Sequence, residues 1–378
     1  MRNKTKPIYL SPPHMSGREI AFIQQAFAEN YITTAGSNIL KFEQQLSAKI
    51  GINAAVALNS GTAAIHLALK VLHVQAGDEV ICSAFTFVAT ANPVLYLNAI
   101  PVFIDSEPET WNMCPQALES AIQDRLSKGK KPKAIILVHL YGMPAKINQI
   151  LAIAHNYQIP VIEDAAEALG STYQNRSVGT FGVIGLFSFN GNKIITTSGG
   201  GALVSDDPEY TQKASFLASQ AKDPAPHYQH SEVGYNYRMS NIAAGIGLGQ
   251  LEILPERIKK RRSIFKYYQD QLNKYNIIRF QPEPTNVYAN RWLSCMILAP
   301  DQPITIGRIR KALAADFIES RPLWKPLHRQ PLFAQCPFYG QNIAENLFKQ
   351  GLCLPSGSDL TDVDLERIVQ IIQKEIQR

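Results

Sequence analysis

Four short segments of this 378-residue chain place reactive or phosphate-binding side chains just after apolar runs. The first segment covers residues 59–64, NSGTAA, where a Gly-containing turn leads from a strand into a helix. Free backbone N–H groups and the positive dipole end at a helix N-terminus favour a phosphate. Ser60 and Thr62 add hydroxyl donors, although both types also serve as ordinary helix caps. The segment is a candidate phosphate site.

The second and third segments supply a flat ring and an acid. Residues 83–90, SAFTFVAT, follow a strand, and Phe87 could either stack on a planar cofactor or pack in the core. Asp164 follows the apolar run 160–163, where burying a carboxylate is costly unless it is paired. A protonated pyridine nitrogen would be such a partner, and a helix N-cap is the ordinary alternative.

The fourth segment contains a lysine. Lys193 lies on an Asn-Gly turn after the run 184–189, and three glycines, 199–201, follow it. Glycines entering a strand allow a close backbone approach, although a lysine on a tight turn could also be an exposed surface residue. A lysine buried near an apolar wall or a cation loses its proton readily and becomes a nucleophile for a carbonyl. A phosphate cradle, a ring, an acid and an amine together predict pyridoxal 5′-phosphate (PLP) as cofactor.

The elements that must position these segments alternate between short apolar runs and helical repeats. The runs are apolar without alternation, which is typical of strands buried on both faces. Seven such runs cover residues 54–58, 79–82, 101–104, 134–139, 160–163, 184–189 and 202–205. We predict an α/β fold with a mostly parallel seven-stranded sheet and helices on both faces. Ligands of such sheets collect beyond the carboxyl ends of the strands, where all four segments fall.

The pattern changes after about residue 240. Residues 241–272 predict a long helix that is bent or broken at Pro255, followed by Pro-rich loops. A strand is predicted near 292–298, and helices near 306–315 and 360–377. We therefore predict a large cofactor-binding domain over residues 1–250 and a smaller α/β domain over 251–378. The basic run 259–262 falls within the long helix and is interpreted as a solvated helix face.

The composition restricts the class of protein. A net charge of +6 suits anionic small molecules and is weak support for nucleic acid. The five cysteines form no CxxC pair, so neither a disulfide framework nor a metal site is expected. The first fifteen residues lack an apolar signal core and no apolar run reaches 18 residues, so we expect a cytoplasmic protein that does not span a membrane. A Rossmann dehydrogenase is disfavoured because no GxGxxG follows the first strand.

Taken together, the motifs resemble the fold-type I, PLP-dependent sugar aminotransferases of the DegT/DnrJ/EryC1/StrS family. The resemblance extends over nearly the whole chain. It is carried by NSGTAA at 59–64, FTFVATAN at 85–92, IEDAAEALGS at 162–171, FSFNGNKIITTSGGG at 187–201 and GYNYRMSN at 234–241. It implies that Lys193 forms the Schiff base with PLP and that Asp164 pairs with the pyridine nitrogen. Relatives that dehydrate sugars carry histidine at the position of Lys193, so the lysine favours transamination.

The resemblance also implies roles for other residues. Phe87 would stack on the ring, and Thr62, Ala63 and Ser188 would hold the phosphate. Glu167 falls in the cofactor site at a position where the family commonly has Gln or His, so its role is open.

Two further residues concern the assembly. Family members are usually homodimers with shared active sites, which implies that Asn236 or Arg238 reaches the phosphate or substrate of the neighbouring subunit. The sequence does not choose between the two.

A closer resemblance is to transaminases of bacillosamine synthesis, which aminate UDP-2-acetamido-4-keto-2,4,6-trideoxy-glucose. It is carried by SPPHM at 11–15, SFNGNK at 188–193, ESRPLWKPLHRQPLF at 319–333 and PSGSDL at 355–360. It implies that Arg321, Trp324 and His328 lie near the substrate, with loop packing as the alternative for Trp324 and His328. The expected partners are L-glutamate and a UDP-linked keto sugar. The alternatives are a GDP-linked sugar of the perosamine type and a PLP-binding regulator without catalysis.

Overall fold

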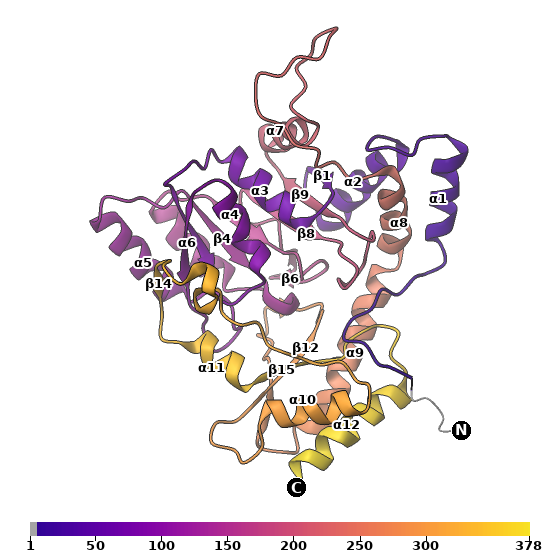
Figure 1. The fold of residues 1–378 in the computed structure, drawn as a ribbon, viewed down its shortest axis with the longest axis vertical. Helices are drawn as coiled ribbons and strands as arrows, with labels where there is room; N and C mark the ends of the chain where they lie inside the picture. The colour runs from indigo at the N-terminus through magenta and orange to yellow at the C-terminus, as the bar shows by residue number, and fades with distance from the viewer. Residues whose placement is uncertain (1–5) are drawn as a thin grey trace.

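A computed structural model describes residues 6–378, which are built around an eight-stranded sheet (Figure 1). Its strand order is β1-β9-β8-β5-β4-β2-β3-β14. The strands are β1 (Ala54–Leu58), β2 (Glu79–Ser83), β3 (Ile100–Ile104), β4 (Ala134–Val138), β5 (Val161–Asp164), β8 (Ile184–Ser188), β9 (Gly201–Ser205) and β14 (Phe338–Tyr339). The strands from β8 to β14 are parallel, whereas β9 is antiparallel to both β1 and β8. The predicted α/β fold with a mostly parallel sheet is confirmed.

All seven predicted strands are present, each within one residue at either end. The eighth strand, β14, was not predicted because it comes from the C-terminal third of the chain and is only two residues long. Asp105, directly after β3, attaches this segment to the sheet. Its carboxylate accepts hydrogen bonds from the backbone N–H groups of Gln341, Ile343 and Ala344.

Helices cover both faces of the large sheet. Alternate strand residues point to opposite faces, so Ile135 and Leu137 lie in one hydrophobic cluster whereas Ala134 and Ile136 lie in another. The first cluster contains residues of α2 (Ser37–Ile50), α5 (Pro115–Ser127), α6 (Ile147–Asn156) and α8 (Asn241–Glu252). The second contains residues of α3 (Gly61–Val71), α4 (Asn92–Tyr96) and α7 (Pro208–Ala218). The short helix α1 (Glu19–Ala28) packs on α8.

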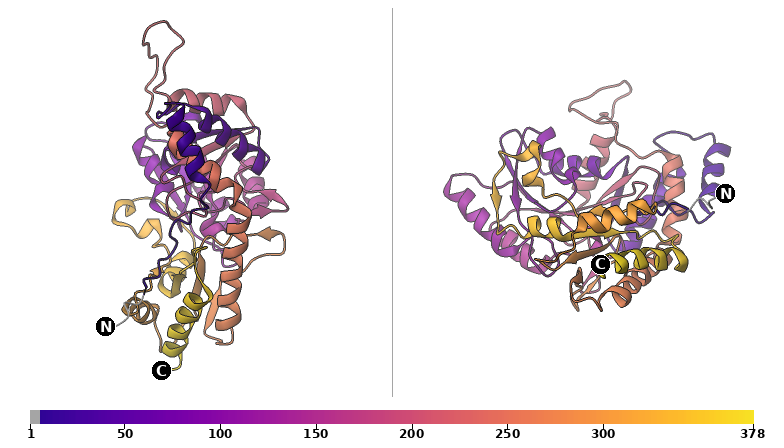
Figure 2. Two further views of the ribbon diagram at one scale, coloured as in Figure 1. Left: turned by 90° about the vertical axis from the view of Figure 1, so that its right-hand side faces the viewer. Right: turned by 60° about the horizontal axis from the view of Figure 1, so that its bottom comes forward.

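The C-terminal part, coloured orange to yellow in Figure 2, contains a second sheet. The order of its strands is β10-β12-β15-β13. Its strands are β10 (Ile278–Phe280), β12 (Ser294–Leu298), β13 (Arg321–Pro322) and β15 (Gly351–Leu354). The helices α9 (Leu254–Leu272), α10 (Ile306–Ala315) and α12 (Asp362–Ile376) share a third hydrophobic cluster with this sheet. Helix α11 (Ile343–Gln350) follows β14 in the chain and packs on β12 and β15. A third, small sheet contains β11 (Val287–Tyr288), β6 (Thr172–Tyr173) and β7 (Arg176–Ser177).

The predicted break in the long helix is confirmed. Helices α8 and α9 are separated at Ile253, and Pro255 lies in the first turn of α9, where its missing N–H is tolerated. The N-terminal segment joins the third cluster, since Ile8 is buried there and pairs with Ile318. The domain boundary at residue 250 stays a prediction.

None of the helices in residues 6–378 combines the length and apolar character that a membrane-spanning helix needs. In the same part of the chain no group of three His, Cys, Asp or Glu side chains is arranged to hold a metal ion. The first five residues of the predicted signal-free N-terminus lie outside the described residues.

Candidate active site

A cavity of about 320 Å³ lies at the carboxyl ends of the parallel strands. This volume is in the range of small-ligand pockets. The loops after β1, β2, β5 and β8 contribute its walls, and the C-terminal part contributes Trp292 and Trp324. The cavity brings together the predicted site residues Thr62, Phe87, Asp164, Glu167, Ser188, Lys193 and Trp324.

One end of the cavity is the N-terminus of α3. Ser60 is the N-cap, and its hydroxyl accepts the N–H of Ala63 at 3.1 Å. The N–H of Ala63 is thus used by the cap, and Ala63 does not line the cavity, whereas Gly61 and Thr62 do. The first N–H groups of a helix have no partner within the helix, so Gly61 and Thr62 present theirs to a ligand.

Glycines allow this end of the cavity to be compact. A Cβ on Gly201 would lie 2.4 Å from the carbonyl carbon of Ser60, and one on Gly61 would lie 3.1 Å from Cβ of Ser188. The close approach predicted from the three-glycine run is therefore between β9 and the N-terminus of α3. It places Ser188, at the end of β8, beside the first turn of the helix.

Asp164 also lines the cavity and is buried at the end of β5. Its Oδ2 accepts a hydrogen bond from Thr90 Oγ1 at 2.8 Å, and its Oδ1 accepts one from the N–H of Ala166 at 3.2 Å. No helix follows, since residues 165–171 form turns, so the helix-cap alternative is wrong. Burial raises the pKa of Asp164, although both hydrogen bonds and the nearby Lys193 act in the opposite direction. A buried acid of this kind is suited to a cationic partner inside the cavity.

Lys193 is enclosed between an acid and an aromatic ring. Its Nζ lies 3.7 Å from Glu167 Oε1 and 4.1 Å from the centre of the Trp292 ring. The side chain is only 13% exposed, so the surface-residue alternative is wrong. Burial raises the pKa of Glu167, whereas Lys193 and a hydrogen bond from the N–H of Tyr141 at 2.6 Å lower it.

An aromatic group forms the open side of the cavity. Phe87 is 51% exposed there, so it is not a core residue, and its ring centre lies 5.6 Å from that of Trp324. Trp324 also stacks on Tyr141, and its backbone N–H donates to the Tyr141 hydroxyl at 2.8 Å. Its indole N–H is buried in the cavity wall and has no acceptor among the described residues.

Besides Ala63, four predicted site residues do not line the cavity of this chain. Arg321 is exposed and pairs with Glu319 at 2.8 Å. His328 stacks on Phe338 with ring centres 3.7 Å apart, and its Nε2 lies 3.2 Å from Glu345. Loop packing thus explains His328, and burial lowers its pKa.

The other two lie on the segment between α7 and α8. Arg238 donates to Glu43 at 2.8 Å, and the carbonyl of Asn236 accepts from the Asn59 side chain at 3.3 Å. Within one chain, neither side chain therefore contributes to the cavity.

Several residues of the site were not identified from the sequence. Trp292 lies about a hundred positions from Lys193 along the chain, so no local pattern connects the two. Thr90 and Tyr141 contact Asp164 and Glu167 through backbone turns whose shape the sequence does not reveal. Tyr141 itself has a positive φ of 56°, which is uncommon for an aromatic residue.

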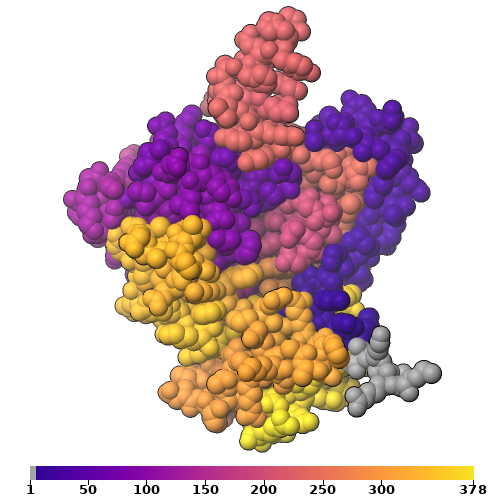
Figure 3. Space-filling model, in the orientation of Figure 1, coloured from indigo at the N-terminus to yellow at the C-terminus, as the bar shows by residue number. Residues whose placement is uncertain are grey.

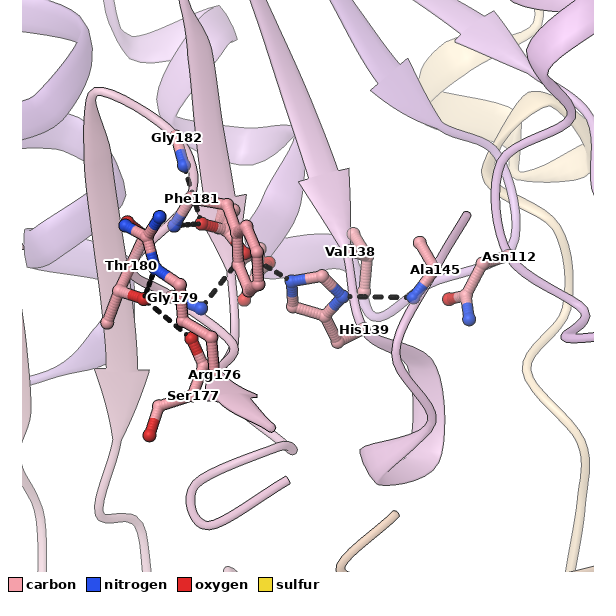
Figure 4. Close-up of polar contacts among 12 residues, drawn as sticks. Asn112, Val138, His139, Ala145, Arg176, Ser177, Gly179, Thr180, Phe181 and Gly182 are labelled. Carbon is pink, nitrogen blue, oxygen red and sulfur yellow. Dashed lines mark hydrogen bonds and ion pairs between the residues drawn. The ribbon is translucent and has the colours of Figure 1, made fainter. Parts of the chain in front are cut away.

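A buried polar pair, Glu163 and His139, lies next to Asp164 in the sheet, and Figure 4 shows His139 with its contact to Ala145. Glu163 accepts hydrogen bonds from three backbone N–H groups of residues 179–182 and lies 2.9 Å from His139 Nε2. The other ring nitrogen of His139 accepts the N–H of Ala145, so Nε2 carries the proton and donates to Glu163. Burial alone would raise the pKa of Glu163, but these donors bring it below its usual value. The pair anchors the end of β5, where Asp164 follows.

The donor set of the cavity fits PLP. A helix N-terminus with adjacent hydroxyl groups suits the phosphate, Asp164 suits a protonated ring nitrogen, and Lys193 supplies the amine for the aldehyde. Gly61 and Gly201 are in close contact with the residues around this phosphate site. A side chain at either position would change the shape of the site.

Comparisons with known proteins agree with this assignment. EpsN of Bacillus subtilis, to which a pyridoxal phosphate-dependent aminotransferase activity is ascribed, is 54% identical over 371 residues, covering 97% of this chain and 95% of EpsN. The GDP-perosamine synthase of Caulobacter vibrioides is 36% identical over 97% of this chain and 98% of the synthase. The PLP form of a sugar aminotransferase from Streptococcus pneumoniae, Spr1654, superposes with a TM-score of 0.90 at 26% identity, covering 98% and 99% of the two chains.

The family is identified by a match that extends along almost the entire length of this chain. The model of the DegT/DnrJ/EryC1/StrS aminotransferase family matches residues 13–373, and the two relatives above cover the same span. The family predicted from the motifs is thereby confirmed, and the cofactor with it. This chain belongs to the DegT/DnrJ/EryC1/StrS family and is a PLP-dependent sugar aminotransferase.

Proposed function

We propose that this chain transfers an amino group from L-glutamate to C4 of a nucleotide-linked 4-keto-6-deoxy sugar, with UDP-2-acetamido-4-keto-2,4,6-trideoxy-glucose as the substrate. The observation that carries the proposal is the position of Lys193, whose amine lies inside the cavity beside Glu167 and Trp292. PLP, when bound, supplies an aldehyde that carries the amino group and a ring that accepts electrons. The chain's own residues bind, orient and exchange protons.

Binding is divided among several parts of the cavity. Thr62, Ser188 and the start of α3 would hold the phosphate, and the capped N–H of Ala63 would keep that turn in shape. Asp164 would keep a proton on the ring nitrogen, and Phe87 would cover the ring from the open side.

Proton transfer is assigned to Lys193. An amine can take a proton from the α-carbon of the amino donor and return it at the carbon that receives the nitrogen. Glu167 Oε1 lies 3.7 Å from the amine and the centre of the Trp292 ring lies 4.1 Å from it, so both contact the group that moves the proton. In this proposal Glu167 therefore acts together with Lys193 and not with the phosphate.

A second copy of the chain is part of the proposal. Large apolar side chains are 49% to 68% exposed on α1, in the loop after it and on α2; they are Ile20, Phe27, Tyr31, Ile32 and Leu40. An apolar surface of this kind marks a protein interface. Part of the segment between α7 and α8 projects from the body of the molecule (Figure 3), and Asn236 and Arg238 lie where this segment returns to the body, bridged to Ser219 and Leu58. We propose a homodimer in which one of these two residues reaches the neighbouring cavity.

Two separate observations bear on the choice of nucleotide sugar. Trp324, one of the three residues expected near the substrate, lines the cavity, and its buried indole N–H has no acceptor among the described residues. The 36% identity to a GDP-perosamine synthase favours a second candidate, GDP-4-keto-6-deoxymannose. Both candidates present a C4 ketone, so the chemistry at Lys193 is common to them.

A panel of UDP-, GDP- and dTDP-linked 4-keto sugars, each supplied with L-glutamate and analysed by mass spectrometry, tests the proposal. We expect a 4-amino product from the UDP sugar together with 2-oxoglutarate. Turnover of a GDP or dTDP sugar alone would replace the UDP assignment. Absence of any product from PLP-loaded protein would favour the non-catalytic regulator.

A further inference from the structure

The basic run at residues 259–262 contains one side chain that is not solvated. Lys259 is exposed and Arg262 partly so, but Arg261 is 1% exposed and belongs to the largest fully buried side chains. The prediction of a solvated helix face is therefore wrong for Arg261. Burial lowers its pKa to about 10. A buried cation is costly unless specific partners compensate it.

The partners of Arg261 are not carboxylates. Within residues 6–378 no acidic oxygen lies within 4.0 Å of its guanidinium, although Asp359 acts on it from further away. One terminal nitrogen donates to the backbone carbonyl of Trp292, and the other donates to Ser11 Oγ at 2.9 Å. Arg261 thus connects helix α9 to the N-terminal segment and to the loop before β12.

Both partners of Arg261 converge on a single carbonyl oxygen. The hydroxyl of Ser11 donates to the carbonyl of Asn192 at 2.7 Å, and the indole N–H of Trp292 donates to the same oxygen at 2.7 Å. Arg261, Ser11, Asn192 and Trp292 form a closed ring of hydrogen bonds. The four residues come from four separate parts of the chain.

The ring of hydrogen bonds includes the backbone from which the Lys193 side chain starts. Asn192 directly precedes the lysine, and the turn that holds them is partly exposed. The Nζ of Lys193 lies over the same indole that donates to Asn192. The ring therefore holds both the peptide from which the lysine side chain starts and the surface on which its amine rests.

We propose that Arg261 is a positioning residue for Lys193, acting through Ser11 and Trp292 on the Asn192 carbonyl. This inference rests on the proposed role of Lys193. The planar guanidinium can donate in two fixed directions at once, which suits two acceptors on different segments. A lysine at this position could not hold both partners in the same geometry, and an apolar residue would leave the Trp292 carbonyl without its donor.

The test compares Arg261→Met and Arg261→Lys with Arg262→Met, a neighbour on α9 that pairs with Glu283 and lies outside the ring. The first readout is the pH at which the absorbance of the bound cofactor changes. The second is the split between kcat and KM. Since small misplacements of a reacting group cost up to about 100-fold, we expect Arg261→Met to lower kcat about 10- to 100-fold with little change in KM. We also expect it to shift the absorbance titration, while Arg262→Met does neither.

Two more conservative variants test the same role of Arg261 if Arg261→Met does not fold. Ser11→Ala and Trp292→Phe each remove one donor to the Asn192 carbonyl, and Trp292→Phe keeps an aromatic ring beneath Lys193. We expect both to shift the absorbance titration in the same direction, and the double variant to shift it by more than the sum, because the carbonyl then loses both donors.

Outcomes that contradict the inference are distinct from those that contradict the proposed function. Folded Arg261→Met, or the double variant, with a titration and kcat matching the wild type would overturn the positioning role. Failure of the wild-type protein to form a borohydride-stable adduct with PLP at Lys193 would instead overturn the proposed role of that lysine.

Discussion

The amine of Lys193 lies 3.7 Å from Oε1 of Glu167, and both side chains are largely enclosed by the protein. Glu167 is held from its other side by the N–H of Tyr141, so the carboxylate is oriented toward the lysine. Lys193 is the nearest cation that lowers the pKa of Glu167 against the effect of burial. The two residues therefore form one ion-paired unit that lines the cavity.

Replacing Lys193 by alanine tests this unit. We expect loss of borohydride-stable PLP attachment and a fall in kcat of about 10³-fold or more, since attachment and proton transfer are both removed. Peptide mass mapping after borohydride treatment checks the attachment site. An adduct on another lysine, or transamination near the wild-type rate, would contradict the assignment.

Asp164→Asn should lower kcat without lowering the stability of the fold. We expect kcat to fall about 100-fold or more, because the ring nitrogen loses its anionic partner. In the cofactor-free protein, burial raises the pKa of Asp164 above its unfolded value, so its ionised form costs stability once the pH rises above that of the unfolded carboxyl.

The variant should therefore be at least as stable as the wild type at pH 7, with the difference shrinking toward pH 4. Urea unfolding of both cofactor-free proteins at the two pH values measures it. A large loss of stability at pH 7 would show that the carboxylate is needed for folding.

Ser60→Ala should weaken PLP binding by more than its loss of folding stability explains. Loss of the N-cap of α3 costs about 1 kcal/mol, and the phosphate cradle also loses a hydroxyl. Thr305→Ala is a matched control, because Thr305 caps α10 in the same way at 3.2 Å and lies in the C-terminal part. We expect similar losses in urea stability but a higher dissociation constant for PLP in Ser60→Ala alone. Equal PLP affinities in the two variants would remove Ser60 from the cradle.

Trp324→Phe tests the unpartnered indole N–H. Phenylalanine keeps an aromatic ring against Phe87 and Tyr141 but removes the donor. One hydrogen bond is worth about 1 kcal/mol, so we expect the KM for the nucleotide sugar to rise about fivefold while PLP affinity is unchanged. Arg321→Ala is the comparison, because that side chain is exposed and pairs with Glu319. A larger effect from Arg321→Ala would show that the substrate extends beyond the cavity.

Glu163→Gln should destabilise the fold in a pH-dependent way. Hydrogen bonds from His139 and residues 179–182 bring the pKa of Glu163 below its usual value despite burial. The stabilisation is complete above the pKa of the unfolded carboxyl, about 4.3, and is lost as the pH falls through the lower folded value.

We expect Glu163→Gln to cost about 3 kcal/mol at pH 7 and less at low pH, where the wild type weakens too. Glu232→Gln, at an exposed pair with Lys213, should cost less than about 1 kcal/mol. Chemical denaturation across the pH range provides the measurement. A loss at pH 7 no larger than that of the exposed pair would contradict the role of the buried carboxylate.

The sequence by itself determined the parts of this protein that depend on local pattern. The strands of the large sheet could be predicted because each buried strand is a short apolar run. Whether a residue directly follows such a run is also visible in the neighbouring sequence. Lys193, Asp164 and the segment 59–64 were therefore found at the correct edge of the sheet.

Tertiary structure decided what depends on contacts between distant segments. The burial of Arg261, the position of Trp292 beneath Lys193 and the pairing of β14 with β3 join residues that lie tens to hundreds of positions apart. It also distinguished two residues that are four positions apart in the chain. Trp324 lines the cavity, whereas His328 packs on Phe338. Hydrophobic periodicity records whether a residue is buried in its own element, but not which distant group it meets there.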